Sequence, residues 1–129
     1  MASDRLSDLT RDVLAFRDAR DWAQFHSLRK LMVSLSLEAA ELLEHTQWLD
    51  DHEVDALSDN PEARQAMGAE CADVLTYLLL IADRAGIDLA AAVRDKLARN
   101  AERYPVDLAR GSREKYTRLK RGDVAKEDR

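Results

Sequence analysis

The chain has 129 residues, of which 46% are hydrophobic and 35% are charged, and its formal net charge is -5 at pH 7. This length and apolar content predict one folded domain and exclude a disordered chain. The acidic balance argues against nucleic acid or an anionic membrane as a partner, because either would require a basic face.

Features that report on the compartment agree with one another. The N-terminus has no apolar signal region, and no run approaches the ~20 apolar residues that a membrane span needs. Cys71 is the single cysteine, which excludes an internal disulfide and fits a reducing compartment. We therefore expect a cytoplasmic protein with no membrane partner, and we interpret Cys71 as a core residue.

The low content of glycine and proline, without alternating β-branched segments, predicts an all-α chain. The first helix is expected to begin at Ser3 or Ser7, since each is a plausible N-cap. The acidic, polar residues 50–61 are interpreted as a loop that holds at most a short turn. The polar tail, residues 118–129, is predicted to be mobile, which leaves residues 1–117 as the domain. The expected main helices run over about residues 3–19, 22–48, 62–85 and 88–103.

The third expected helix is apolar nearly all round between residues 74 and 82. Such a helix must be covered on most of its sides. In so small a protein, other helices or other subunits have to supply that cover. We therefore expect a helical bundle of four main helices that assembles as an oligomer.

Two pairs of carboxylates fall on or beside the apolar stripes of these helices. At ~100° per residue, Glu38 lies within about 20° of the stripe of the second helix, and Glu41 lies about 60° further round. Glu70 and Asp73 repeat this arrangement on the third helix. Two helices therefore each offer an acidic pair to the interior.

Burying four carboxylates requires compensation, because an isolated buried charge costs several kcal/mol. Protonation, ion pairing with arginine or a divalent cation would each supply it. Oxygen ligands alone favour a hard ion such as Mg²⁺ or Mn²⁺. The Glu-x-x-His motif of di-iron bundles does not occur at Glu38, Glu41 or Glu70. The alternative to a metal site is that these carboxylates belong to ordinary solvated helix faces.

The order of these residues resembles a known family. Glu38-x-x-Glu41 followed by Glu70-x-x-Asp73 is similar to the metal-binding signature of the MazG-like all-α nucleotide pyrophosphohydrolases. The likeness covers residues 21–119 and is greatest to the dCTP pyrophosphatase branch. Further matching blocks are Asp21-Trp22-x-x-Phe25-His26, Gln47-Trp48, Ala72-Asp73-Val74-Leu75-x-Tyr77-Leu78, Asn100-x-x-Arg103-Tyr104-Pro105 and Lys115-Tyr116-Thr117.

The sequence departs from the general family motif at one position. That motif begins with two adjacent glutamates, and here Leu37 occupies the first position. Glu44, one turn beyond Glu41, is a candidate to orient the attacking water in its place. The other interpretation of Glu44 is an exposed helix residue.

The resemblance implies an enzyme that hydrolyses nucleoside triphosphates between the α and β phosphates. The implied metal ligands, which are also the catalytic residues, are Glu38, Glu41, Glu70 and Asp73, with Mg²⁺ or alternatively Mn²⁺ as the cofactor. The implied substrate is dCTP or a modified dCTP, and the implied role is nucleotide-pool sanitation. The implied assembly is a homotetramer built from dimers. Alternatives are dUTP or another triphosphate, and a non-catalytic helical scaffold or regulatory oligomer.

Phosphate contacts are implied on the fourth helix. Lys96, Asn100 and Arg103 lie on one face at positions i, i+4 and i+7, and resemble the family positions that contact phosphate. The alternative is a solvated basic face, and Arg103 has the further alternative of pairing with a structural acid.

The resemblance also implies a base pocket. Its members are His26, Trp22, Trp48 and Tyr77, since aromatic rings offer flat faces to a base. Trp22 taken alone is more often a core residue. Tyr116 is assigned to a C-terminal segment that closes over the nucleotide or a neighbouring subunit.

Overall fold

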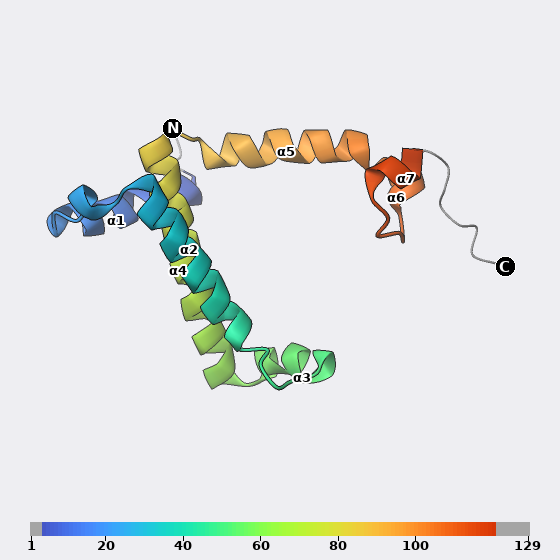
Figure 1. Ribbon diagram of the computed structural model, residues 1–129, viewed down its shortest axis with the longest axis horizontal. Coiled ribbons are helices and arrows are strands. Elements are labelled where there is room, and N and C mark those ends of the chain that lie inside the picture. The colour runs from blue at the N-terminus through green and yellow to red at the C-terminus, as the bar shows by residue number, and fades with distance from the viewer. Residues whose placement is uncertain (1–3, 121–129) are drawn as a thin grey trace. The chain divides into compact units, whose positions relative to one another are not determined.

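A computed structural model describes residues 4–120 (Figure 1). These residues contain helices and no strand, which confirms the all-α prediction. The chain divides after Ile87 into two compact units. Only residues 118–120 of the expected polar tail belong to the described part, and they are helical.

In the first unit, α2 and α4 pack side by side, and α1 packs against α4 (Figure 1). Helices α2 and α4 run antiparallel, because the short helical connection between them reverses the direction of the chain. This packing places one face of α2 against one face of α4 along most of their length. The elements are α1 (Arg5–Ala19), η1 (Ala23–Phe25), α2 (Leu28–Glu44), α3 (Asp51–Ala56), η2 (Leu57–Asp59) and α4 (Pro61–Ala85).

The second helix is shorter than its sequence pattern predicts. The Ser27 side chain accepts a hydrogen bond from the Lys30 N–H at 3.2 Å, so the helix begins at Leu28 and the preceding residues form the separate turn η1. At the other end the helix stops at Glu44, and Trp48 has a left-handed φ of 68°. Apolar periodicity continues across both ends, which is why the sequence suggests a longer helix.

The interpretation of residues 50–61 as a loop is wrong. The Asp50 side chain accepts from the Glu53 N–H at 2.8 Å, and the Glu53 side chain accepts from the Asp50 N–H at 3.3 Å. This reciprocal capping box starts α3 despite its polar sequence. The signal is visible in the sequence as an N-cap aspartate followed three residues later by glutamate.

The core of the first unit is small and lies where α2 meets the C-terminal half of α4. Leu31, at 2% exposure, is the most enclosed large side chain among the described residues. Cys71 is exposed, so its assignment to the core is wrong for the single chain: its side of α4 has no cover here. The buried residues are Leu31, Leu79, Leu80 and Ala82.

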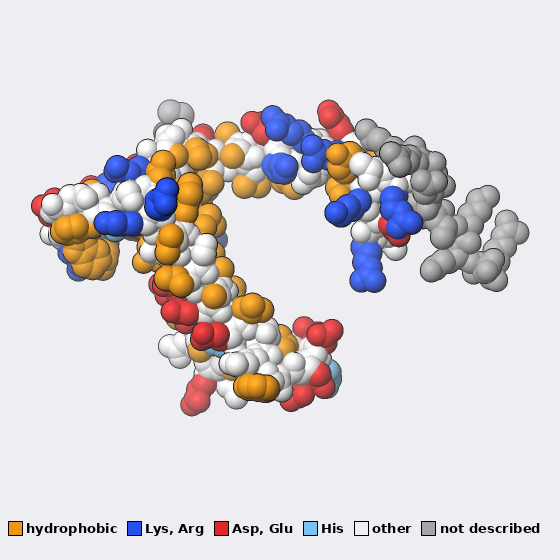
Figure 2. Space-filling model, viewed as in Figure 1, with side chains coloured by type: hydrophobic (Ala, Val, Ile, Leu, Met, Phe, Trp, Pro, Cys, Tyr) orange, Lys and Arg blue, Asp and Glu red, His pale blue; other side chains and the backbone are white. Residues whose placement is uncertain are grey.

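Large apolar side chains remain on the surface over α2 and α4 (Figure 2). On α2, Leu43 is 66% exposed and Leu37 is 60% exposed. By length and composition alone, α4 is also apolar enough to span a membrane. Glu70 and Asp73 at its middle would be costly in a bilayer, and the same composition is typical of a core helix within an assembly.

The second unit contains α5 (Leu89–Arg103), α6 (Val106–Ala109) and α7 (Tyr116–Lys120). Asp88 caps α5 by accepting from the Ala91 N–H at 3.0 Å, at the start that the sequence predicts. Because α5 forms a unit of its own, the packing of four helices into one bundle stays a prediction.

The left-handed end of α4 gives a matched pair of substitutions. Gly86 closes α4 with φ 68°, where a side chain costs about 1–2 kcal/mol, so Gly86→Ala should lower the free energy of unfolding by about 1 kcal/mol. Gly68 lies within the same helix, and a methyl group added to its Cα would meet no packing neighbour within 4 Å. Gly68→Ala should therefore raise that free energy by about 0.5–1 kcal/mol. Urea denaturation measures both, and a Gly86→Ala variant as stable as the wild type would contradict the cap.

Candidate functional site

Three of the predicted carboxylates come together between α2 and α4. Glu38 and Glu41 of α2 and Glu70 of α4 each place a carboxylate oxygen within 4.8 Å of the other two. Helical periodicity explains the convergence, since Glu38 lies on the face of α2 that packs against α4. Glu38 and Glu70 are half-buried, whereas Glu41 is exposed.

This carboxylate cluster, Glu38, Glu41 and Glu70, is electrostatically strained. Oε2 of Glu38 and Oε2 of Glu70 are shielded from solvent and have no hydrogen-bond partner. Burial raises the pKa of Glu38 to about 7, and the adjacent Glu41 carboxylate with the charges of Asp73 and Glu70 contributes to the shift. Burial likewise raises the pKa of Glu70, again with Glu41 and Asp73 contributing.

Asp73 lies outside the carboxylate cluster, although its charge affects pKa values within the cluster. Its side chain is exposed on α4, and its negative charge contributes to the raised pKa values of both Glu38 and Glu70. The structure therefore brings together three members of the predicted ligand set, and the ligand role of Asp73 stays a prediction.

The chemistry of the cluster suits a hard divalent cation. Its donors are carboxylate oxygens, which Mg²⁺ and Mn²⁺ prefer, and a cation would satisfy the two shielded oxygens that lack partners. Among the ion pairs of residues 4–118, none joins an arginine to Glu38, Glu41 or Glu70. Protonation and cation binding are thus the two means that remain for compensating the charge.

A groove of about 410 Å³ lies along the same seam between α2 and α4. Ser34 lies one helical turn before Glu38 on α2, and Tyr77 lies two turns beyond Glu70 on α4, so the groove adjoins the carboxylate cluster. His26 and Tyr77, both predicted base-pocket residues, line it together. The lining residues are Phe25, His26, Arg29, Lys30, Leu31, Val33, Ser34 and Tyr77.

The surroundings of His26 favour the neutral form of its imidazole. Burial lowers the pKa of His26, and the positive charges of Arg17 and Arg84 lower it further. Its Nδ1 atom is shielded from solvent and has no partner. A neutral imidazole can both donate and accept a hydrogen bond, which suits it to reading the edge of a base.

The two tryptophans are not brought to this groove within one chain. Trp22 is 45% exposed and packs edge-to-face on Phe16, with ring centroids 5.8 Å apart. Trp48 is 93% exposed and follows the far end of α2 from His26. Their roles in base binding therefore stay predictions that depend on a neighbouring subunit.

The remaining predicted residues lie in the second unit. Lys96 and Arg103 are exposed on α5 and Asn100 is half-buried. The guanidinium of Arg103 lies 4.9 Å from the centroid of the Tyr116 ring, and Tyr116 in turn contacts Tyr104 edge-to-face. Among residues 4–118, Arg103 forms no ion pair with an acid. The phosphate-binding roles of these residues stay predictions.

Some lining residues have no place in the sequence-based site. Ser34, Arg29 and Lys30 line the groove, although their residue types alone carry no signal. Ser34 could have been found by counting one helical turn back from Glu38 along the same stripe. Arg29 and Lys30 could not have been predicted as groove residues, because an arginine or lysine on a charged helix is usually solvated.

Comparison with known proteins identifies the family. The model of the MazG-like family matches residues 33–119, which include the carboxylate cluster and α5. A protein of Rattus norvegicus named dCTP pyrophosphatase 1 is 42% identical over 123 residues, or 95% of this chain and 72% of the relative. The Homo sapiens protein of the same name is 41% identical over 122 residues, with the same coverage of 95% and 72%.

A solved structure agrees with this result. The crystal structure of a pyrophosphatase from Archaeoglobus fulgidus has a TM-score of 0.73 and 36% identity to this chain, covering 81% of this chain and 96% of the other. The chain belongs to the MazG-like family. Within it, the chain falls in the branch that contains the dCTP pyrophosphatase 1 proteins of rat and human.

The raised pKa of Glu38 predicts how stability depends on pH without divalent cations. A folded-state pKa of about 7, above the ordinary 4.5, contributes stability below pH 4.5 that is lost as the pH rises through 7. Glu38→Gln cannot ionise, so it should raise Tm in chelator at about pH 8 and leave it nearly unchanged at about pH 4. Thermal unfolding measures this effect. The control is Glu44→Gln, at an exposed position on the same helix, and a wild type more stable than Glu38→Gln at the higher pH would contradict the strained cluster.

Proposed function

We propose that the protein is a cytoplasmic nucleoside triphosphate pyrophosphohydrolase, dependent on Mg²⁺ or Mn²⁺, that prefers dCTP or a modified dCTP. One observation carries the proposal: a cluster of carboxylates from α2 and α4 adjoins a groove lined by His26 and Tyr77, in a chain of the MazG-like family. The proposed role is removal of unwanted nucleotides from the precursor pool.

The carboxylate cluster would hold the cation, with Asp73 of α4 as a further ligand. A bound divalent cation neutralises a triphosphate and lowers the pKa of bound water. The protein's own contribution is to fix Glu38, Glu41 and Glu70 on two packed helices, so that little reorganisation is needed when the cation enters. Glu44, exposed at the end of α2, is the candidate for orienting the attacking water.

The groove would hold the nucleoside. Tyr77 offers a ring face to the base, and neutral His26 offers a donor and an acceptor to its edge. Arg29 and Lys30 line the same groove and contribute positive charge near an anionic substrate. In the proposed assembly, Trp22 and Trp48 complete the pocket, Lys96, Asn100 and Arg103 contact phosphate, and Tyr116 closes over the nucleotide.

The proposed reaction is hydrolysis of a phosphoanhydride. Water attacks a phosphorus of the link between the α and β phosphates, and the bond between that phosphorus and the bridging oxygen breaks. Pyrophosphate leaves, the monophosphate keeps the base and sugar, and a proton is released to solvent. Hydrolysis of this kind needs no co-reactant other than water, and catalysis consists mainly of positioning and charge stabilisation.

Assembly is part of the proposal, as a homotetramer built from dimers. The buried core of one chain is small, while Met32, Val33, Leu37 and Leu43 of α2 are each at least 50% exposed. A single chain with so little enclosed apolar surface would have marginal stability. Light scattering at micromolar concentration should give the mass of a tetramer, and a stable monomer would contradict the proposed assembly.

A substrate panel tests the activity. Purified protein with Mg²⁺ is assayed against each common dNTP and NTP and against 5-methyl-dCTP, with release of pyrophosphate and monophosphate followed separately. We expect dCTP or its analogue to be the best substrate. Preference for dUTP or another triphosphate would change the substrate and keep the chemistry, whereas failure to cleave any triphosphate would favour the non-catalytic scaffold.

A matched pair of variants ties that activity to the cluster. Glu70→Gln keeps the size of the side chain and removes its charge, so kcat/KM should fall by about 10²-fold or more. Glu62→Gln makes the same change at an exposed position in the first turn of α4 and should retain wild-type activity. If Glu70→Gln were as active as Glu62→Gln, the cluster would not be the site of reaction.

A further inference from the structure

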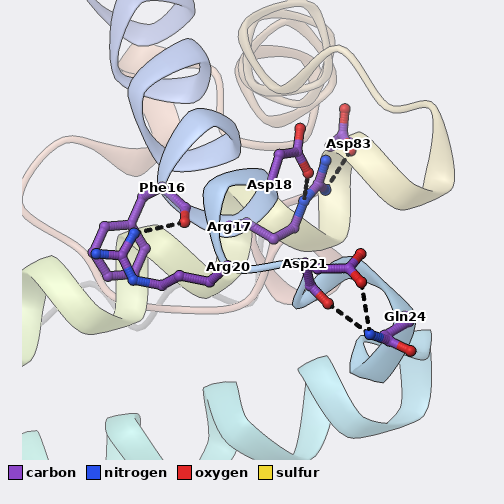
Figure 3. A network of polar contacts seen from close by, with 7 residues as sticks. All are labelled: Phe16, Arg17, Asp18, Arg20, Asp21, Gln24 and Asp83. Carbon is purple, nitrogen blue, oxygen red and sulfur yellow. Dashed lines mark hydrogen bonds and ion pairs between the residues drawn. The ribbon is translucent and has the colours of Figure 1, made fainter.

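An ion pair joins α1 to α4 near the C-terminal end of α4, in the same unit as His26. Nη1 of Arg17 lies 3.0 Å from Oδ2 of Asp83, between residues 66 positions apart in the sequence (Figure 3). The Arg17 side chain is only 16% exposed, whereas that of Asp83 is 37% exposed. Nε of the same guanidinium donates to Asp18 at 2.8 Å, which fixes its orientation.

Arg17 also anchors the chain that leads to His26. Its carbonyl oxygen accepts hydrogen bonds from the N–H groups of Arg20 and Trp22, both at 3.2 Å. These bonds close the turn after α1, in which Asp21 adopts a φ of 52°. The turn leads directly into η1, and the His26 N–H donates to the Ala23 carbonyl at 3.1 Å. Because the Trp22 carbonyl accepts from the Phe25 N–H at 2.9 Å, backbone hydrogen bonds link the turn after α1 to η1 and His26.

The ion pair and His26 line the same cavity. This cavity of about 210 Å³ is lined by Arg17, Asp83 and Arg84 together with His26, and His26 also lines the groove. His26 itself lies between η1 and α2 in a non-helical conformation, and its Nδ1 has no hydrogen-bond partner. No hydrogen bond at Nδ1 therefore fixes the His26 ring, and residues of the α1–α4 junction line a cavity beside it.

We propose that Arg17, through its ion pair with Asp83, is a positioning residue that holds His26 in the groove where the base of the nucleotide binds. The inference rests on the proposed function for its substrate and on the ion pair for its mechanism. Loss of the pair frees the end of α1 from α4, and η1 with His26 moves with it. Base binding weakens, while the carboxylate cluster further along α2 and α4 is unaffected.

An effect of Arg17 and Asp83 on His26 through their charges alone can be told apart from positioning. Several charged groups face His26. Arg17 from α1, Arg84 and Asp83 from α4, and Arg29 and Lys30 from α2 line the two cavities around it. Arg17→Gln removes a positive charge that opposes the imidazolium, whereas Asp83→Asn removes a negative charge that favours it. An electrostatic effect on His26 would therefore have opposite signs in the two variants. A positioning effect has the same sign in both.

The test compares kcat and KM for the preferred triphosphate in wild type, Arg17→Gln, Asp83→Asn and the double variant. We expect each single variant to raise KM by about tenfold with kcat within about twofold of wild type, and the double variant to be no worse than either single one. Asp18→Asn keeps an oxygen that can accept from Nε of Arg17 and leaves the pair between the helices intact, and Arg11→Gln alters an exposed pair within α1, so both controls should keep the wild-type KM.

Amide hydrogen exchange supplies a measurement that does not depend on activity. Exchange in residues 22–26 should accelerate in both Arg17→Gln and Asp83→Asn and stay unchanged in both controls. Unchanged exchange and KM in the two variants would overturn the proposal, as would KM changes of opposite sign. If the wild type cleaves no triphosphate, the proposed function fails, and the exchange measurement still decides whether the ion pair positions His26.

Discussion

The contact between α2 and α4 forces carboxylates of like charge into one partly buried cluster. Glu38 and Glu70 each keep an oxygen shielded from solvent and unpaired, and Glu41 adds a third negative charge. The chain thus carries an electrostatic cost at the centre of its main helix pair, which a proton or a cation must offset. Natural proteins retain such strain chiefly at functional sites, and in this chain of the MazG-like family we propose that the strain serves binding of a metal ion.

The same contact organises the rest of the proposed site. The seam between the packed helices α2 and α4 runs from the carboxylate cluster to the groove lined by His26 and Tyr77. A nucleotide laid along this seam would place its phosphates and its base over different parts of the same two helices. The ion pair between Arg17 and Asp83 fastens α1 to the far end of α4, and in our proposal this contact holds His26 in the groove.

Helix signals predicted much of this arrangement. Gly86 and Asp88 mark the end of α4 and the start of α5 where the sequence places them, and helical spacing placed Glu38, Glu41 and Glu70 on or beside the apolar faces of α2 and α4. Local rules failed where two signals competed: the cap at Ser27 interrupts an apolar stripe that continues through it. The sequence could not predict where Trp22 lies, because Trp22 reaches Phe16 only through a turn that contains a left-handed residue.

The exposure of Cys71 was not predictable either, since its place on a largely apolar helix suggests a core position. In the proposed assembly, a neighbouring subunit would cover it.

Diffraction from crystals grown with Mn²⁺ tests the central claim most directly, because the anomalous signal of manganese locates the ion independently of the protein atoms. The account predicts an anomalous peak among Glu38, Glu41 and Glu70, within coordination distance of their carboxylate oxygens and of the two previously unpaired oxygens in particular. The control crystal, of Glu38→Gln, should show a weakened peak or none. A peak located only elsewhere, or none at saturating Mn²⁺ in the wild type, would contradict the assignment of the cluster as a metal centre.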